Sequence, residues 1–335
     1  MKRLFPIFLF ITALLSPCCA QIVPSEALQQ AMQRDETAFL QSMSPTLQHT
    51  QALAVRMAIQ GDARALQQIR ESRNVAPTFP EGVKAVTLTP TMTLFRSTQP
   101  TSKPRPVLLY LHGGGWCFGS INSCMRFCAA VAKRANICVV ALNYRLAPEH
   151  AYPAPIDDCR MAFNYLKGHA AEFGGDTTRV SIGGDSAGGN LAIATAMTVG
   201  GKSSVYSLIP IYPVTELFTR STPSWRTYAQ GYGDDAELLE AFNEAYAAGQ
   251  QQSPLVSVGL ATDETLQQLP PVLLISAGHD ILFDQTTAWA KRLQSLDHPL
   301  SYHVFPTATH LFITVPGQPT AFNESVRIVS EFLKE

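Results

Sequence analysis

Residues 183–190 read GGDSAGGN and place Ser186 within the pattern Gly-x-Ser-x-Gly. The preceding RVSIGG predicts a strand and the following NLAIATAMTV predicts a helix, so the serine falls at a sharp turn between the two. Such a turn strains the serine backbone, and glycine neighbours let other elements approach closely. The pattern alone is common, but its strand-turn-helix context predicts a nucleophilic serine.

A glycine-rich segment, LLYLHGGGWCFGS, follows an earlier predicted strand. Glycines leave backbone N–H groups uncovered, so we expect those of Gly113 and Gly114 to converge with that of Ala187, the residue after the serine. Three donors around one oxygen atom would form an oxyanion hole. The alternatives are a flexible loop and a phosphate-binding loop. The latter would need a following Lys-Ser/Thr or a G-x-G-x-x-G spacing, and the segment has neither.

The general base and its orienting acid should follow at later strand ends. His310 stands in the loop TATHLF after the last predicted strand, whereas the other histidines lie in helical stretches, in the glycine loop or beside strands. Asp280 closes the strand PVLLISAGHD, while Asp284 is placed to cap the next helix. His279 adjoins Asp280, but neighbours on an extended chain point to opposite sides. The order Ser186, Asp280, His310 is that of the α/β-hydrolase triad.

Four residues are assigned to the substrate pocket. Trp116 and Phe118 directly follow the glycine loop, Asp185 precedes the nucleophile, and Tyr212 ends a predicted strand. An aromatic wall beside the bound carbonyl would admit acetyl to butyryl groups and exclude long chains. The alternative is that the two aromatic rings fill core space beneath the loop.

Short β-branched runs alternate with helical runs after residue 80, and this rhythm predicts an α/β protein with a doubly wound, mostly parallel sheet. VKAVTLTPTMTLFRST predicts a strand pair. Six further strands are predicted in PVLLYLHG, ICVVALNYR, RVSIGGDS, YSLIPIYP, PVLLISAGHD and SYHVFPTATH, and helices at about 121–135, 154–172, 187–199, 284–296 and 320–334. Residues 21–75 have helical spacing, and the rhythm pauses at 214–252, where extra helices would roof the sheet edge.

Together these motifs resemble the hormone-sensitive-lipase family of carboxylesterases. The resemblance covers residues 76–335 and includes HGGG, NYRLAPEHAYPAPIDD, GDSAGGN, SPLVS, LPPVLLISAGHDILFD and His310 with Leu-Phe after it. It implies an α/β-hydrolase catalytic domain whose N-terminal helices and inserted helices form a cap. One departure is Asn143, where the family usually has an aspartate. It puts in question the expected charge network around Arg145 and Glu149.

Residues 1–20 predict a signal peptide, because Lys2 and Arg3 precede an apolar run from Leu4 to Leu15, which is followed by Ser16-Pro17-Cys18-Cys19-Ala20. The run is too short for the roughly 20 residues of a membrane span. We therefore expect cleavage after Ala20, a periplasmic or secreted protein and no stable membrane insertion. A retained N-terminal anchor is one alternative. Lipidation at Cys18 is another, although it would need a small residue where Pro17 stands.

Charge and cysteine content exclude several classes of partner. Loss of Lys2 and Arg3 leaves 23 basic and 26 acidic residues, a formal charge of −3 without a basic run, so nucleic acid is not an expected partner. The five remaining cysteines lack metal-ligand spacing, and no metal is expected. We expect them to be small buried hydrophobes, with one disulfide between separate elements left open.

The sequence thus predicts a serine carboxylesterase that hydrolyses short-chain esters, acetyl to butyryl, through an acyl-enzyme and without a cofactor. The partner would be a small-molecule ester. An amidase, peptidase or lactonase on the same fold is one alternative, and a non-catalytic ligand-binding relative is another. The alcohol part of the substrate and the oligomeric state stay open.

Overall fold

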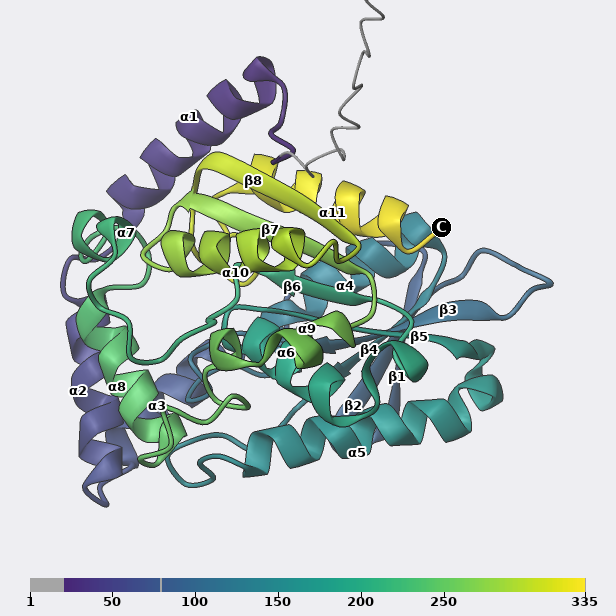
Figure 1. Ribbon diagram of the computed structural model, residues 1–335, viewed down its shortest axis with the longest axis horizontal. Coiled ribbons are helices and arrows are strands. Elements are labelled where there is room, and N and C mark those ends of the chain that lie inside the picture. The colour runs from purple at the N-terminus through teal and green to yellow at the C-terminus, as the bar shows by residue number, and fades with distance from the viewer. Residues whose placement is uncertain (1–20, 79, 335) are drawn as a thin grey trace, which may run out of the picture.

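The computed structural model describes residues 21–78 and 80–334, and the predicted signal peptide lies outside them. Eight strands form one sheet in the order β1-β2-β4-β3-β5-β6-β7-β8 (Figure 1). β2 pairs antiparallel with β1 and β4, and the pairs from β4 onward are parallel. The strands are β1 (Val83–Thr89), β2 (Met92–Ser97), β3 (Arg105–Leu111), β4 (Cys138–Leu142), β5 (Gly175–Asp185), β6 (Leu208–Ile211), β7 (Val272–His279) and β8 (Leu300–Thr309). The predicted α/β-hydrolase sheet is confirmed.

Helices cover both faces of this sheet. Along β3, Val107, Leu109 and Leu111 pack into one core, and Leu108 and Tyr110 pack into the other, because successive side chains alternate across a strand. α5, α6 and α10 contribute to the first core, and α4 and α11 to the second. Burial on both faces explains why the central strands read as continuous apolar runs. The helices are α4 (Ile121–Ala135), α5 (Ala154–His169), α6 (Ala187–Thr198), α9 (Asp263–Gln267), α10 (Phe283–Ser295) and α11 (Pro319–Phe332).

Two segments far apart in the sequence form a helical layer at one end of the sheet, which we call the cap. Figure 1 shows α2 and α8 side by side there. Arg56 on α2 binds Glu237 on α8 at 2.9 Å, and His49 contacts the same carboxylate at 2.8 Å. The N-terminal and inserted helical segments therefore pack together. The cap helices are α1 (Glu26–Ser42), α2 (Leu47–Ile59), α3 (Arg64–Arg73), α7 (Pro223–Thr227) and α8 (Ala236–Ala247).

The cysteines in the described part of the chain are buried and unpaired, so the disulfide left open by the sequence is absent there. Burial raises the pKa of the Cys138 thiol to about 11, which keeps it neutral and unreactive. The described cysteines therefore serve as small core residues. Between Gln21 and Lys334, no helix has the length and apolar character needed to cross a membrane.

Candidate active site

Ser186 occupies a strained turn between β5 and α6. Its φ angle is +56°, a region that side-chain-bearing residues rarely adopt. A Cβ atom at Gly188 would lie 2.0 Å from the carbonyl oxygen of Leu111, and one at Gly184 would lie 2.5 Å from the carbonyl oxygen of Gly188. Both glycines are therefore required by close backbone packing around the turn. This packing holds the serine at the carboxyl end of the sheet.

The three residues predicted as a triad lie together in one hydrogen-bonded chain. His310 Nε2 is 2.8 Å from Ser186 Oγ, and His310 Nδ1 is 2.7 Å from Asp280 Oδ2. Asp280 is held in turn by the backbone N–H of Leu282, which donates to its other oxygen at 2.9 Å. The side chains of the three residues are buried. This geometry allows the imidazole to accept the serine proton while the aspartate fixes its tautomer.

A second carboxylate lies beside the same imidazole. Asp234, in the loop before α8, places Oδ2 3.5 Å from His310 Nε2. Burial alone would lower the pKa of His310, but Asp280 and Asp234 outweigh it and raise that pKa to about 9. Burial also raises the pKa of Asp234 itself. Sequence reasoning missed Asp234 because the cap loop carries no motif and meets His310 only in the folded chain.

The loop that carries His310 is fixed by two neighbours. Gln318 donates from Nε2 to the carbonyl oxygen of His310 at 3.1 Å and accepts the N–H of Thr309 at 3.0 Å. The Tyr212 ring packs 4.4 Å from the His310 ring, and its hydroxyl oxygen accepts the N–H of Ile313 at 3.2 Å. Both residues position the imidazole. The sequence contained no signal for Gln318 beyond its place just before α11.

The glycine loop lies against Asp185. Gly113 donates its N–H to Asp185 Oδ1 at 3.2 Å, and the Tyr110 hydroxyl donates to the same oxygen at 3.0 Å. Burial raises the pKa of Asp185 to about 6, although these hydrogen bonds oppose the shift. The N–H of Gly113 is thus already engaged, contrary to the expectation of three free donors. Gly114 and Ala187, which begins α6, are the remaining predicted donors.

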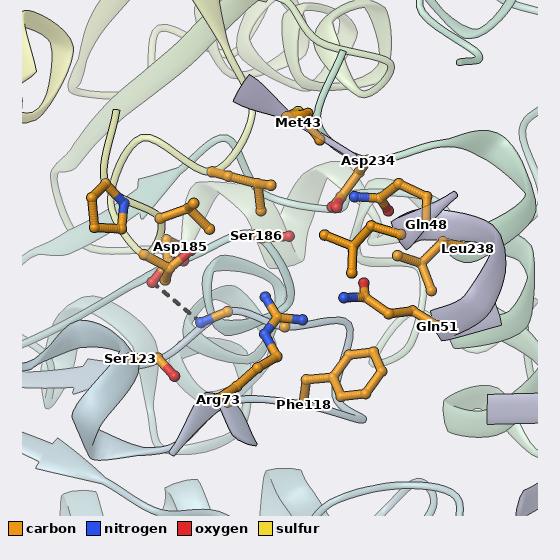
Figure 2. A pocket seen from close by; sticks show the side chains of 18 of the residues that line it. Met43, Gln48, Gln51, Arg73, Phe118, Ser123, Asp185, Ser186, Asp234 and Leu238 are labelled. Atoms are coloured by element: carbon orange, nitrogen blue, oxygen red, sulfur yellow. Dashed lines mark hydrogen bonds between the residues drawn. The ribbon is translucent and has the colours of Figure 1, made fainter. Parts of the chain in front are cut away.

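A cavity of about 470 Å³ opens above Ser186 (Figure 2). Phe118 and Asp185, two of the predicted pocket residues, belong to its lining. The cap supplies most of the opposite wall, where apolar and polar side chains mix. These cap residues are Phe39, Met43, Leu47, Gln48, Gln51, Arg73, Asp234, Leu238 and Phe242.

The other two predicted pocket residues lie outside this lining. Trp116 is fully buried, and its ring stacks on Tyr246 at 4.3 Å between centroids with an interplanar angle of 3°. Through this stacking contact, the indole of Trp116 packs the glycine loop against α8. Tyr212 is turned toward His310 instead of the cavity. The pocket prediction is therefore corrected for Trp116 and Tyr212, whose rings pack in the protein core.

Asp284 does not cap α10 as expected. The residue before that helix is Leu282, and Asp284 Oδ2 accepts the N–H of Ser224 at 2.7 Å. The Ser224 hydroxyl accepts the N–H of Asp284 at 3.2 Å in return. Asp284 thus fastens α7 of the cap to α10, and of the two aspartates that follow β7 it is Asp280, not Asp284, that contacts His310.

The residues around Asn143 form a rearranged polar network. Asn143 Oδ1 accepts the N–H of Ile121 at 2.7 Å, at the start of α4. Arg145 pairs with Asp158 at 2.8 Å. Glu149 pairs with Arg70 of α3, also at 2.8 Å. The neutral amide of Asn143 therefore accepts a free backbone N–H at the start of α4. Arg145 and Glu149 each have an ion-pair partner elsewhere.

Comparison with known proteins agrees with the fold described above. Residues 108–314 match a family described as having the alpha/beta hydrolase fold. The chain belongs to the hormone-sensitive-lipase-like family of α/β-hydrolases. Within this family it is 33% identical over 232 residues to esterase LipI of Mycobacterium tuberculosis, covering 68% of this chain and 72% of the relative. It is also 33% identical over 233 residues to ethyl acetate hydrolase of Pseudomonas putida, with the same coverage.

Matches to the curated relatives span 57 to 73% of their lengths. Their names include esterase, carboxylesterase, lipase and acetyl esterase, which support the classification of this chain as a carboxylic ester hydrolase. Among solved structures, the α/β-hydrolase LAE6 from the metagenome of Lake Arreo superposes with a TM-score of 0.69 at 26% identity, covering 92% of this chain and 98% of that one. A thermostable esterase from Pseudomonas putida ECU1011 superposes with a TM-score of 0.73 at 22% identity, covering 88% and 98%, and shows the fold alone.

Proposed function

We propose that this protein is a serine carboxylesterase that hydrolyses short-chain acyl esters, acetyl to butyryl, through Ser186, His310 and Asp280. The observation that carries the proposal is the unbroken hydrogen-bonded chain from Asp280 through His310 to Ser186 at the floor of a cavity. The names of the relatives support ester chemistry.

In acylation, His310 Nε2 accepts the Ser186 hydroxyl proton while Oγ attacks the ester carbonyl carbon. The carbonyl electron pair moves to oxygen, where the N–H groups of Gly114 and Ala187 would stabilise the oxyanion. Asp280 stabilises the imidazolium. When the oxyanion collapses, the ester C–O bond breaks and His310 protonates the departing alcohol.

Deacylation repeats these steps with water. His310 accepts a proton from water, the hydroxide attacks the acyl-enzyme carbonyl, and the bond from the acyl carbon to Ser186 Oγ breaks. The serine recovers its proton from the imidazolium, and the carboxylic acid leaves. The cycle is balanced without a cofactor.

The preference for short acyl groups rests on the aromatic rings next to the glycine loop. Phe118 and Phe242 both line the cavity and meet edge to face with ring centroids 5.4 Å apart. Each acyl methylene that fits contributes about 0.8 kcal/mol until such a wall is reached. We expect kcat/KM to rise or hold from C2 to about C4, to fall by C8 and to be negligible by C16.

A panel of p-nitrophenyl esters from C2 to C16, run beside the matching anilides, tests the proposal. Turnover of the acetate and butyrate with little anilide cleavage is the expected result. A preference for anilides would indicate an amidase, and failure to turn over any compound would indicate a ligand-binding protein. An optimum at C10 or longer would contradict the short-chain assignment.

We propose in addition that residues 1–20 are removed on export, so that the mature protein begins at Gln21 in the periplasm or outside the cell. The charged start and short apolar run support this. Amino-terminal sequencing of the protein from fractionated cells should give a chain that starts at Gln21. A chain that retains Met1 in the membrane fraction would contradict export by cleavage.

A further inference from the structure

Arg73 is a basic side chain in the lining of a cavity whose floor carries the nucleophile. It is the last residue of α3. Figure 2 shows its guanidinium pointing into the middle of the pocket, from the side opposite Met43 and Asp234. The guanidinium carbon lies 5.3 Å from the centroid of the Phe118 ring, a cation–π contact that holds the side chain over the glycine loop.

The guanidinium donors of Arg73 have no hydrogen-bond acceptor among the described residues. Arg70, one turn earlier on the same helix, binds Glu149 and the carbonyl oxygens of Cys117 and Ala147. Within residues 21–78 and 80–334, by contrast, the guanidinium of Arg73 forms neither a hydrogen bond nor an ion pair. The side chain remains accessible to solvent, yet its pKa is lowered because protein surrounds it. Both facts fit a guanidinium in an open cavity that is ready to bind a ligand.

Asp234 is the carboxylate whose charge favours the protonated form of Arg73 across the cavity. It does not pair with Arg73 in the described structure, and its Oδ2 atom lies 3.5 Å from His310 Nε2 instead. When His310 becomes an imidazolium during the reaction, that charge attracts Asp234 further. Asp234 is therefore directed at His310, and the guanidinium of Arg73 is available to bind the substrate.

We propose that Arg73 binds a carboxylate on the substrate, so that the preferred substrates are short esters that carry one free carboxylate. This inference rests on the proposed esterase function and specifies its substrate class. The planar guanidinium matches the two oxygens of a carboxylate. One positive charge balances one negative charge, whereas a phosphate monoester carries up to two, and Asp234 would repel that larger charge more strongly than it repels a carboxylate.

The surrounding wall is polar as well. Gln48 and Gln51 of α2 are buried in the cavity lining, and Gln48 Oε1 lacks a hydrogen-bond partner among the described residues. A long hydrocarbon chain in this part of the cavity would cover Arg73 and Gln48 without satisfying them, which costs free energy. A compact polar ester leaves room to hydrate or bind them.

Two pairs of nearly isosteric esters test the proposal and locate the carboxylate. Monoethyl succinate and its neutral analogue ethyl levulinate differ in the acyl part. 3-Acetoxypropanoate and neutral 4-acetoxybutan-2-one differ in the alcohol part. kcat/KM is measured for each with the wild-type protein, Arg73→Gln, Arg73→Lys and the matched control Arg64→Gln, an exposed arginine of the same helix that binds only Asp62.

In at least one pair we expect the wild-type protein to prefer the anionic ester at least tenfold. Arg73→Gln should lower the ratio of anionic to neutral kcat/KM by about 10- to 100-fold, since hydrogen bonds to charged groups have that effect. Arg73→Lys should retain part of the preference and Arg64→Gln all of it. Added salt should weaken the wild-type preference.

Equal wild-type kcat/KM within both pairs, or an unchanged ratio in Arg73→Gln, would overturn the role of Arg73. If Arg73→Gln does not fold, the wild-type ratios and their salt dependence decide the question without it. Hydrolysis of the neutral esters separates the two proposals. Turnover of neutral esters without an anionic preference rejects only the substrate class, and absence of turnover for all four compounds rejects the esterase function.

Discussion

Asp234 Oδ2 lies 3.5 Å from His310 Nε2, the same nitrogen that faces Ser186 Oγ at 2.8 Å. The other ring nitrogen faces Asp280 at 2.7 Å. The imidazole is therefore flanked by a carboxylate on each side, one from the end of β7 and one from the cap. The cap does more than cover the site, because it contributes charge to the base.

This arrangement predicts an alkaline pH profile. The pKa of His310 is raised from its ordinary value of 6.5 to about 9, and only the neutral imidazole can accept the serine proton. We expect kcat/KM for p-nitrophenyl butyrate to rise with pH up to about 9. The raised pKa of His310 also contributes to the free energy of unfolding, with the opposite pH trend. That contribution is fully present below pH 6.5 and is lost as the pH rises through about 9. A flat profile between pH 6 and 9 would argue against a doubly flanked imidazole.

Asp234→Asn should move the acidic limb of that profile to lower pH by about one unit or more, the usual effect of removing a charge this close. The reason is that Asp234 stabilises the protonated imidazole. Asp235→Asn is the matched control, because the Asp235 carboxylate accepts the N–H of Gly231 at 2.7 Å and asparagine can do the same. If both variants keep the wild-type limb, Asp234 does not act on His310.

Asp280→Asn and Asp284→Asn should differ sharply in kcat. Asp280 accepts two hydrogen bonds, from the Leu282 N–H and from His310 Nδ1, whereas asparagine has a single acceptor oxygen. Its amide N–H groups would then face the imidazole and favour the wrong tautomer, and we expect kcat to fall by about 10⁴-fold, as for this change in the serine-protease triad. The second variant retains an oxygen that can accept the N–H of Ser224, so kcat should change little. Steady-state kinetics of the two variants checks this. A reversed order would mean that the wrong aspartate was chosen as the orienting acid.

Much of this site could be predicted because the triad stands at strand ends. The positions of Ser186, Asp280 and His310 follow from local patterns of strand, loop and helix, and parallel strands bring their carboxyl ends to one edge of the sheet. The prediction that Asp284 caps α10 is wrong, because this carboxylate binds Ser224 instead. Ser224 comes from the cap, and local helix rules cannot anticipate such a contact.

Residues contributed by the cap could not be predicted for the same reason. Asp234 and Arg73 lie in segments without motifs, far in sequence from the nucleophile, and only packing of the two cap segments brings them to the cavity. The prediction that Trp116 lines the substrate pocket is wrong because its ring stacks on Tyr246 of the inserted α8. This contact places the indole in the core instead of the cavity. The catalytic residues were therefore easier to predict from the sequence than the residues that line the cavity.

Gly188→Ala should destabilise the protein by about 3 kcal/mol or more, because the new methyl group would meet the Leu111 carbonyl oxygen at 2.0 Å. Gly168→Ala is the control on α5, where a Cβ atom has no neighbour within 4 Å. An alanine in that helix should stabilise by about 0.5–1 kcal/mol. Urea unfolding of both variants measures the difference. Equal stability would mean that the turn is less tightly packed than described.

The most direct test of the account is covalent labelling of the nucleophile by a p-nitrophenyl phosphonate. Peptide mapping by mass spectrometry should find one adduct per chain, on Ser186, together with one equivalent of released p-nitrophenol and loss of esterase activity. Ser186→Ala should remain unlabelled, fold normally and lose about 10⁴-fold or more in kcat. An adduct on another residue, or near wild-type turnover by Ser186→Ala, would contradict the assignment of Ser186 as the catalytic nucleophile.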